Sequence, residues 1–404
     1  MLLVSLIFIA CSQSDKNEKL DPRAADFSQK AQKIHQASML VDTHIDIPYR
    51  ITKEQVNISD RLPDGHFDFV RAKEGGLDVP FFAVYVSSDF NKPGTFSGAK
   101  GGAYNEAIRI INQVDSVVSA NSGVAALAMS TTDVESIVKS NKIAVCMGME
   151  NGAPIEGDMQ KLHNLHQKGI RYITLVHAKD NHICDSSYDE RHTNKGLTEF
   201  GKKVIDEMNK IGMMIDISHV SDDVFWQVMK LSKAPVIASH SSLRKFRKME
   251  RNMSDSMLVA LAKNGGVLQF NFGSFFITDE FGIPAQNRYE FKDSIDVKYK
   301  NNGEKAAALY AQYIEEHPTP PNTTIDEVVR QLDYAIKLVG IEHIGLGSDY
   351  DGVGVVPVGL EDVSKYPELT KKLLAIGYTA NDIEKINGGN LMRVWKEVEQ
   401  FSMR

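Results

Sequence analysis

The sequence predicts a single-domain (β/α)₈ barrel of the TIM type. Eight short apolar runs recur along the chain, and such runs are typical of strands buried in parallel sheets. Segments with helical periodicity separate them, and six of the eight runs end in an acidic or histidine side chain. Alternating strands and helices imply parallel strands joined by crossover helices. Eight such units favour closure into a barrel, and an open doubly wound sheet is the competing architecture.

The composition is that of a globular enzyme, with 404 residues, 42% of them hydrophobic and 25% charged. Barrels of this type routinely use roughly 250 or more residues as one domain, so the length does not require a second one. The net charge is −7, and no block of like charge stands out. A nucleic-acid partner therefore has no electrostatic support.

The first eleven residues, MLLVSLIFIAC, resemble a signal peptide that ends at Cys11. The apolar stretch is shorter than the roughly 20 residues that span a bilayer. A small residue before Cys11 and the polar SQSDKNEK after it resemble the lipobox of bacterial lipoproteins, although no Lys or Arg precedes the core and Phe8 stands where Leu is usual.

We therefore expect a signal peptide over residues 1–11, a tether over 12–30 and the catalytic domain over 31–404. A lipid on Cys11 would be the protein's only attachment to the membrane of the cell envelope. The alternative is a cytoplasmic chain with an apolar start. Labelling with a radioactive fatty acid, in the wild type and in Cys11→Ala, distinguishes the two.

The two other cysteines, Cys146 and Cys184, form no C-x-x-C pair with each other or with Cys11. Neither a disulfide framework nor a zinc ribbon is indicated. Cys146 lies within the apolar run AVCMGM, which predicts a buried structural thiol.

The predicted strands follow one another through the whole chain, at residues 38–46, 77–86, 142–150, 171–177, 212–219, 234–240, 265–272 and 342–349. Apolar residues at i, i+3 and i+4 predict helices between them, over residues 103–121, 196–212, 221–233 and 254–265. Ser221 and Ser254 are predicted N-caps, and Gly212 and Gly265 lie where the chain must turn back into a strand. Residues 379–404 predict one or two closing helices.

One connection, residues 275–324, is longer than the rest. It carries aromatic residues, the proline-rich HPTPPN and one predicted helix, GEKAAALYAQYIEE. Long loops in compact domains tend to be functional. We expect a cover or an oligomer contact here rather than a second domain.

Ionisable side chains gather at the ends of the predicted strands. The first strand ends in DTHID, where the two-residue period of a strand points Asp42, His44 and Asp46 to the same side. The remaining five, on later strands, are Glu150, His177, His219, His240 and Asp349. All carboxyl ends of barrel strands surround one mouth, so these side chains are predicted to share a site. A single histidine or carboxylate after an apolar run is more often a structural residue, so the prediction depends on their joint occurrence.

Imidazole and carboxylate ligands without thiolate suit zinc or a similar divalent ion. The five predicted ligands, His44, Asp46, Glu150, His219 and His240, are too many for one tetrahedral zinc with an open position. They fit two ions that share a carboxylate, for which Glu150 is the predicted bridge. Such a pair holds a water or hydroxide as the nucleophile and polarises the scissile carbonyl.

Eight stretches together resemble the membrane (renal) dipeptidase family, zinc metallopeptidases on an amidohydrolase-like barrel. They are VDTHIDIP, GMENG, RYITLVHAKDN, GLTEFGKKVIDEMNKIGMMIDISHVS, PVIASHSSLR, RNMSD, IGLGSDYDGV and GGNLMRVWKEVE. They run from about residue 34 to 400, so the resemblance covers nearly the whole chain after its first segment. Departures are Gln331 and Tyr334, where the family often has two histidines, and a poor match over residues 275–324.

The resemblance implies a dipeptidase and a role for each residue. His44 and Asp46 would hold one zinc, His219 and His240 the other, and Glu150 would bridge them. Three further residues would serve the substrate: Asp349 as the proton carrier to the leaving amine, His177 as a contact to the carbonyl oxygen, and Arg251 as the clamp on the C-terminal carboxylate. The resemblance also implies tolerance of D-amino acids at the second position and a homodimer.

Two other functions stay open from the sequence alone. The first is a related amidohydrolase that uses the same metal pair and acts on N-acyl amino acids or other small amides. The activity of the purified protein on dipeptides and on N-acyl amino acids distinguishes it from a dipeptidase. The second is an inactive, lipid-anchored binding protein on a decayed barrel. Decay would normally remove a metal ligand or the proton carrier. All six of these residues are present, namely His44, Asp46, Glu150, His219, His240 and Asp349.

Overall fold

The structure, a computed structural model, describes residues 22–91 and 102–403. Cys11 and the predicted signal peptide lie outside these ranges. Among the described residues, no helix has both the length and the apolar character needed to cross a bilayer.

Eight parallel strands form the barrel in the described part of the chain, in the order in which they occur in the sequence. They are β1 (Leu40–Ile45), β2 (Leu77–Tyr85), β4 (Ile143–Glu150), β5 (Ile170–Thr174), β6 (Met214–Asp216), β7 (Ile237–Ser241), β8 (Val267–Phe270) and β9 (Ile344–Leu346). The first and last strands meet through two backbone hydrogen bonds, Asp349 N–H to His44 O at 3.0 Å and Asp46 N–H to Tyr350 O at 2.8 Å. This contact closes the barrel, so the open doubly wound sheet is excluded.

All eight predicted strands are present, and their ends lie within three residues of the predicted bounds. A further strand, β3 (Ala125–Leu127), pairs with β4 outside the barrel and was not predicted. Its three residues, Ala-Ala-Leu, are too few to show a periodicity.

The early positions of several strands form a cluster inside the barrel that includes Val79, Phe81, Cys146 and Tyr172, all fully buried. The C-terminal helix α16 (Asn390–Ser402) adds Trp395 to this cluster, with its ring centroid 5.5 Å from that of Phe81. Side chains therefore fill the end of the barrel where the strands begin. Any site must lie at the other end, where the strands finish. The buried thiol predicted at Cys146 is confirmed.

Helices surround the barrel, and the four predicted ones are present as α4 (Gly102–Ala120), α7 (Glu199–Ile211), α8 (Asp222–Leu231) and α9 (Asp255–Lys263). Ser221 accepts a hydrogen bond from Val224 N–H and Ser254 accepts one from Met257 N–H, so both predicted N-caps are confirmed. Gly212 ends α7 with φ +73°, a left-handed conformation that favours glycine.

The remaining α-helices are shorter or lie at the chain's ends and in the long connection. They are α1 (Pro22–Ala37), α2 (Ile47–Lys53), α3 (Phe69–Glu74), α5 (Thr131–Lys139), α6 (Met159–Gln167), α10 (Ser274–Ile277), α11 (Asp279–Lys298), α12 (Gly303–Glu316), α13 (Ile325–Val339), α14 (Tyr366–Ala375) and α15 (Ala380–Glu384). Helix α1 occupies residues 22–30 of the segment expected to be a tether. Helices α15 and α16 match the expected closing helices.

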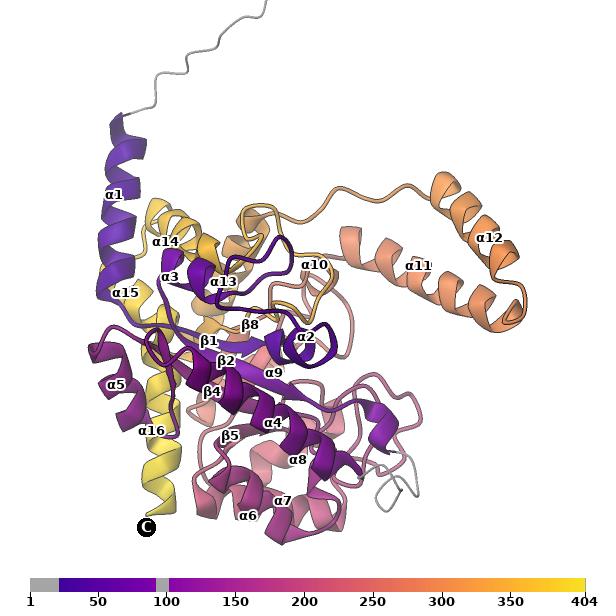
Figure 1. Cartoon of the computed structure of the whole chain (residues 1–404), viewed down its shortest axis with the longest axis horizontal. Helices are drawn as coiled ribbons and strands as arrows, with labels where there is room; N and C mark the ends of the chain where they lie inside the picture. Colours follow the sequence, from indigo (N-terminus) through magenta and orange to yellow (C-terminus); the bar gives the residue numbers. More distant parts are fainter. Residues whose placement is uncertain (1–21, 92–101, 404) are drawn as a thin grey trace, which may run out of the picture.

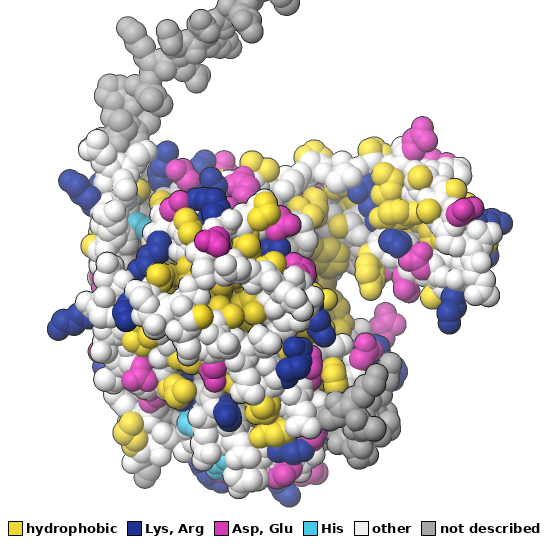
Figure 2. Space-filling model, in the orientation of Figure 1, with side chains coloured by type: hydrophobic (Ala, Val, Ile, Leu, Met, Phe, Trp, Pro, Cys, Tyr) yellow, Lys and Arg dark blue, Asp and Glu magenta, His cyan; other side chains and the backbone are white. Residues whose placement is uncertain are grey.

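The long connection divides into two parts. Helix α10 stays at the barrel, where the carbonyls of Phe276 and Ile277 accept hydrogen bonds from Asn252 and Gln331. Helices α11 and α12 form a hairpin that extends away from the barrel (Figure 1). Hydrophobic side chains lie among charged ones on the surface of this hairpin (Figure 2), and Tyr289 and Val297 on α11 are 74% and 71% exposed. An oligomer contact at this hairpin stays a prediction.

Candidate active site

The five predicted metal ligands meet at the mouth of the barrel around Glu150, the last residue of β4. Its Oε1 lies 3.0 Å from His219 Nε2 and 3.4 Å from His240 Nε2. Its Oε2 lies 3.8 Å from His44 Nε2, which is also 3.3 Å from Asp46 Oδ2. All five side chains are buried. Glu150 thus lies among the three histidines, with Asp46 beside His44, and its role as a bridge stays a prediction.

His177 and Asp349 lie at the edges of this cluster. His177 Nε2 is 3.7 Å from Glu150 Oε1, and the side chain is 21% exposed, so it faces the opening. Asp349 has an oxygen within 4.8 Å of ligand atoms of His44 and Asp46. Its other partner is Asn271 at the end of β8, whose amide donates to Asp349 Oδ2 at 2.7 Å. The structure therefore brings together all six strand ends that the sequence singled out.

Tyr172 sets the protonation of His44. The Tyr172 hydroxyl donates to the carbonyl of Thr43 at 2.8 Å and lies 2.8 Å from His44 Nδ1. A phenol has one proton to donate, so it must accept from His44 Nδ1–H. In the neutral imidazole, His44 Nε2 then carries the lone pair and faces the carboxylates. This is the form in which imidazole binds a metal.

The same logic applies to His240. The Ser239 hydroxyl donates to Asp216 Oδ2 at 2.5 Å and lies 2.8 Å from His240 Nδ1. Ser239 therefore accepts from His240 Nδ1–H, and His240 Nε2 carries a lone pair toward Glu150. Asp216 is fully buried and also accepts from the Ser218 and Ser239 backbone N–H groups, which hold it in place. In two of the three proposed histidine ligands, His44 and His240, a hydrogen bond at Nδ1 thus directs Nε2 toward the place where a cation would bind.

The cluster fits a cation on its own geometry. His44 Nε2 is buried and makes no hydrogen bond to any residue that the structure describes. The Nε2 atoms of His219 and His240 face each other at 2.8 Å. Three carboxylates, those of Asp46, Glu150 and Asp349, are buried in the same cavity. Neighbouring buried carboxylates, and imidazole nitrogens that face each other, are costly unless a positive ion lies among them. These residues therefore fit divalent metal.

The carboxylates differ in their electrostatic surroundings. Burial raises the pKa of Asp349 to about 8, and the negative charges of Asp46 and Glu150 add to this effect. Burial would also raise the pKa of Glu150, but nearby histidines, His177 first, hold that pKa well below its usual range. Burial raises the pKa of Asp46 as well. Asp349 and Asp46 are thus the carboxyls disposed to carry a proton, and Glu150 is disposed to stay charged.

Arg251 lies beside the cluster with a buried guanidinium, 4% exposed. Its Nη1 donates to Ser241 Oγ at 2.8 Å and its Nη2 to the His240 carbonyl at 2.6 Å. The ring of Phe276 on α10 lies 5.5 Å from the guanidinium. Among the described residues no carboxylate lies within ion-pair distance of it, and its Nε has no partner. A buried cation in this state can accept an anion from a ligand.

Asp42 does not face the cavity, although its position in DTHID suggested it. Its Oδ1 accepts from Ser348 N–H at 2.9 Å and from His44 N–H at 3.1 Å. Its Oδ2 accepts from the hydroxyls of Ser348 and Tyr366. Asp42 therefore ties the first strand to the last and supports the site from behind.

Several residues of the site could not be found from the sequence. Tyr172 and Asn271 act through hydrogen bonds to His44 and Asp349, and neither lies in a pattern that predicts chemistry. Gly148 in β4 leaves room for the Tyr172 ring, which a Cβ there would meet at 1.9 Å. Gly352 allows the last loop to pass over the carboxylates, since its Cβ would lie 2.2 Å from Asp46 Oδ2.

The hydrogen bond between Tyr172 and His44 predicts the effect of removing one hydroxyl. We expect Tyr172→Phe to bind zinc about 10 to 100 times more weakly than the wild type, because His44 Nδ1 loses the acceptor that sets its tautomer. Competition with a chromogenic chelator measures the affinity. Tyr378→Phe is the matched control, because its hydroxyl donates to Asp333 at 3.0 Å far from the site. Unchanged affinity in Tyr172→Phe would show that other contacts orient His44.

Comparison with known proteins shows the same family along nearly the whole chain. Residues 28–404 match the model of the membrane dipeptidase family, peptidase family M19. An uncharacterized dipeptidase of Schizosaccharomyces pombe is 32% identical over 375 residues, which cover 90% of this chain and 81% of the relative. Dipeptidase ataJ of Aspergillus terreus is 29% identical over 391 residues, 90% of this chain and 86% of the relative. The crystal structure of the probable dipeptidase PvdM from Pseudomonas aeruginosa superposes with a TM-score of 0.79 at 25% identity, covering 94% of this chain and all of the other.

Proposed function

Because the chain belongs to the membrane dipeptidase family and is a metal-dependent dipeptidase, we propose that it hydrolyses dipeptides at a pair of zinc ions. The observation that carries the proposal is the position of Glu150, whose two oxygens lie near three buried histidines, His44, His219 and His240, with the fifth ligand, Asp46, beside His44. One tetrahedral ion with an open position needs only three of them. The second pair of ligands therefore supports a second ion.

In this proposal His44 and Asp46 hold one ion, His219 and His240 hold the other, and Glu150 serves both. When bound, the two ions supply an activated water and polarise the scissile carbonyl. The outer hydrogen bonds from Tyr172 and Ser239 keep His44 and His240 in the tautomer that binds. Divalent ions similar to zinc would find the same ligands.

Asp349 is the proposed proton carrier. Its raised pKa favours holding a proton, and Asn271 fixes Oδ2 so that the remaining oxygen can face the reacting amide. The proton that it holds would pass to the nitrogen of the leaving amine as the amide bond breaks. His177, partly exposed at the rim, would donate a hydrogen bond to the developing oxyanion.

Arg251 gives the proposal its substrate class. A buried guanidinium with a free edge binds one carboxylate well and a neutral chain end poorly. The substrate would therefore carry a free C-terminal carboxylate directly after the scissile amide. A dipeptide has this arrangement, with an L- or a D-amino acid at the second position. N-acyl amino acids share the carboxylate, so they are the alternative substrates to compare.

Metal removal tests the proposal. We expect purified protein to release two amino acids from L-Ala-L-Ala or L-Ala-D-Ala, to lose this activity after chelator treatment, and to regain it with zinc. Elemental analysis should find two metal ions per chain in the active protein. N-acetyl-Ala is the comparison substrate. If the protein with two bound ions hydrolyses N-acyl amino acids but no dipeptide, it is a related amidohydrolase. If it binds all of these substrates without turnover, it is a binding protein.

A further inference from the structure

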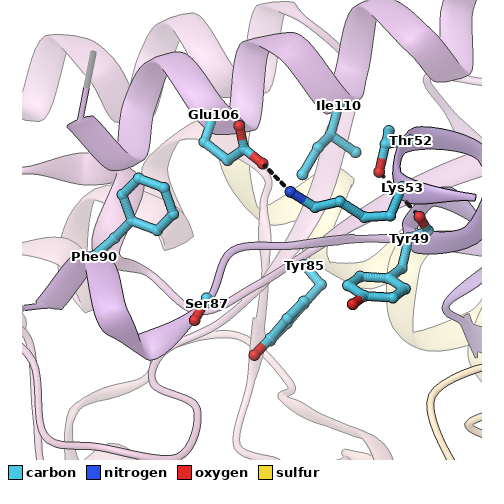
Figure 3. Close-up of a pocket in the computed structure, with 8 residues that line it drawn as sticks. All are labelled: Tyr49, Thr52, Lys53, Tyr85, Ser87, Phe90, Glu106 and Ile110. Carbon is cyan, nitrogen blue, oxygen red and sulfur yellow. Dashed lines mark hydrogen bonds and ion pairs between the residues drawn. The ribbon is translucent and has the colours of Figure 1, made fainter. Parts of the chain in front are cut away.

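A pocket opens at the barrel mouth between the end of β2 and the helices α2 and α4. The rings of Tyr49, Tyr85 and Phe90 stand around it, and Ile110 closes one side (Figure 3). Along its upper edge in this view lies an ion pair, Lys53 Nζ to Glu106 Oε1 at 3.8 Å. The walls are therefore mainly aromatic and aliphatic. The carboxylate of Glu106 at the edge is bound more closely by Arg109, whose Nη2 lies 2.7 Å from Oε1.

Tyr85 joins this pocket to the active site. It is the last residue of β2 and lies opposite Glu150 in the register of the sheet. The edge of its ring faces His177, with 4.9 Å between the ring centroids. Only the side chain of Tyr85 therefore separates the pocket from a substrate that is bound at the proposed metal-binding residues.

The pocket and Arg251 lie on opposite sides of the mouth. In the closed order of eight strands, β2 and β7 are separated by half a turn. Arg251 is held by His240 and Ser241 of β7, and the pocket begins at Tyr85 of β2. Glu150 and His219 lie between the two. A substrate whose C-terminal carboxylate binds Arg251, with its amide bond at the central cluster, must extend its first residue toward the pocket.

We propose that this pocket binds the side chain of the first residue of the dipeptide and selects large neutral apolar or aromatic side chains there. The inference rests on the proposed function, because it takes its direction from the carboxylate at Arg251. Three aromatic rings favour an aromatic side chain through contact area and edge-to-face packing. Glu106, the carboxylate at the pocket edge, is already paired with Arg109 and Lys53. A charged side chain would therefore lose its water on entering without gaining a free counter-ion.

Steady-state kinetics with two matched substrate series test the proposal. The first series is Phe-Ala, Leu-Ala and Gly-Ala, and the second is Ala-Phe, Ala-Leu and Ala-Gly. We expect kcat/KM for Phe-Ala to exceed that for Gly-Ala by roughly 10- to 100-fold, the range that an apolar enzyme pocket gives for added hydrocarbon. Replacing Thr52, a partly exposed residue of the lining, with phenylalanine should fill the pocket, lower kcat/KM for Phe-Ala by a larger factor than for Gly-Ala and so remove most of this advantage.

Thr132→Phe is the matched control, because Thr132 is an exposed threonine of α5, away from the pocket. It should leave both series unchanged, and equal melting temperatures of the two variants exclude a folding effect. Equal kcat/KM for Phe-Ala and Gly-Ala, or equal losses on both in Thr52→Phe, would overturn the inference and leave the proposed function intact. A loss confined to the second series would place the second residue in the pocket and also overturn it. No hydrolysis of any dipeptide would overturn the proposed function and this inference together.

Discussion

Asp349→Asn is expected to lower kcat by roughly 10³-fold while the protein keeps its full complement of metal. The amide has nearly the same size and can still accept a hydrogen bond from Asn271, which donates to Asp349 at 2.7 Å. It cannot take up and release a proton at neutral pH, so the leaving amine would depart unprotonated. Metal content should stay constant because the five proposed ligands are other residues. Turnover of L-Ala-L-Ala and elemental analysis of the same preparation measure the two quantities.

The matched control for this variant is Asp326→Asn on α13, an exposed carboxylate that pairs with Lys372 at the surface. It should retain wild-type turnover. Near-normal kcat in Asp349→Asn would show that another group moves the proton. A protein that loses one metal ion would instead identify Asp349 as a ligand, which its position beside His44 and Asp46 also permits.

Arg251→Ala is expected to cost about 3 kcal/mol of transition-state binding, roughly a 150-fold loss in kcat/KM for dipeptides with a free carboxylate. The physical reason is that the carboxylate loses its buried partner and is left unpaired. Hydrolysis of the corresponding dipeptide amides, which have no carboxylate, should be slow in the wild type and fall little further in the variant. The contribution of Arg251 to carboxylate binding is measured by the difference between the losses in kcat/KM for the two substrate classes, rather than by either rate alone.

Arg251→Lys is the conservative companion variant. It keeps the charge but not the planar fork, so we expect an intermediate loss. Arg251 also donates to the carbonyl of His240, so metal content must be compared to exclude displacement of that ligand. Equal losses on acids and amides, with normal metal content, would show that Arg251 supports the site without binding the carboxylate.

The barrel itself was predictable because its signals are local. Each buried strand is a continuous apolar run, and helix boundaries are marked by residues that satisfy free backbone groups, such as Ser221 and Ser254. Helix α11 was not predicted, for an equally local reason. It contains Pro284 and has no apolar stripe on one side, so its sequence carries no helical periodicity. Strand β3, with three residues, was too short to detect.

The sequence by itself determined which side chains reach the mouth of the barrel, because the ends of parallel strands must meet there. His44, Glu150, His219 and Asp349 could be named in this way, whereas Arg251 was found only through the family resemblance. Only the tertiary structure decided the tautomers of the histidines and the pKa values of the carboxyl groups. The tautomer of His44 depends on Tyr172, 128 residues away in the chain, and the raised pKa of Asp349 depends on its burial, to which the nearby carboxylates add. Such contacts are set by ångström-scale distances between elements that are remote in sequence, and no local pattern encodes those distances.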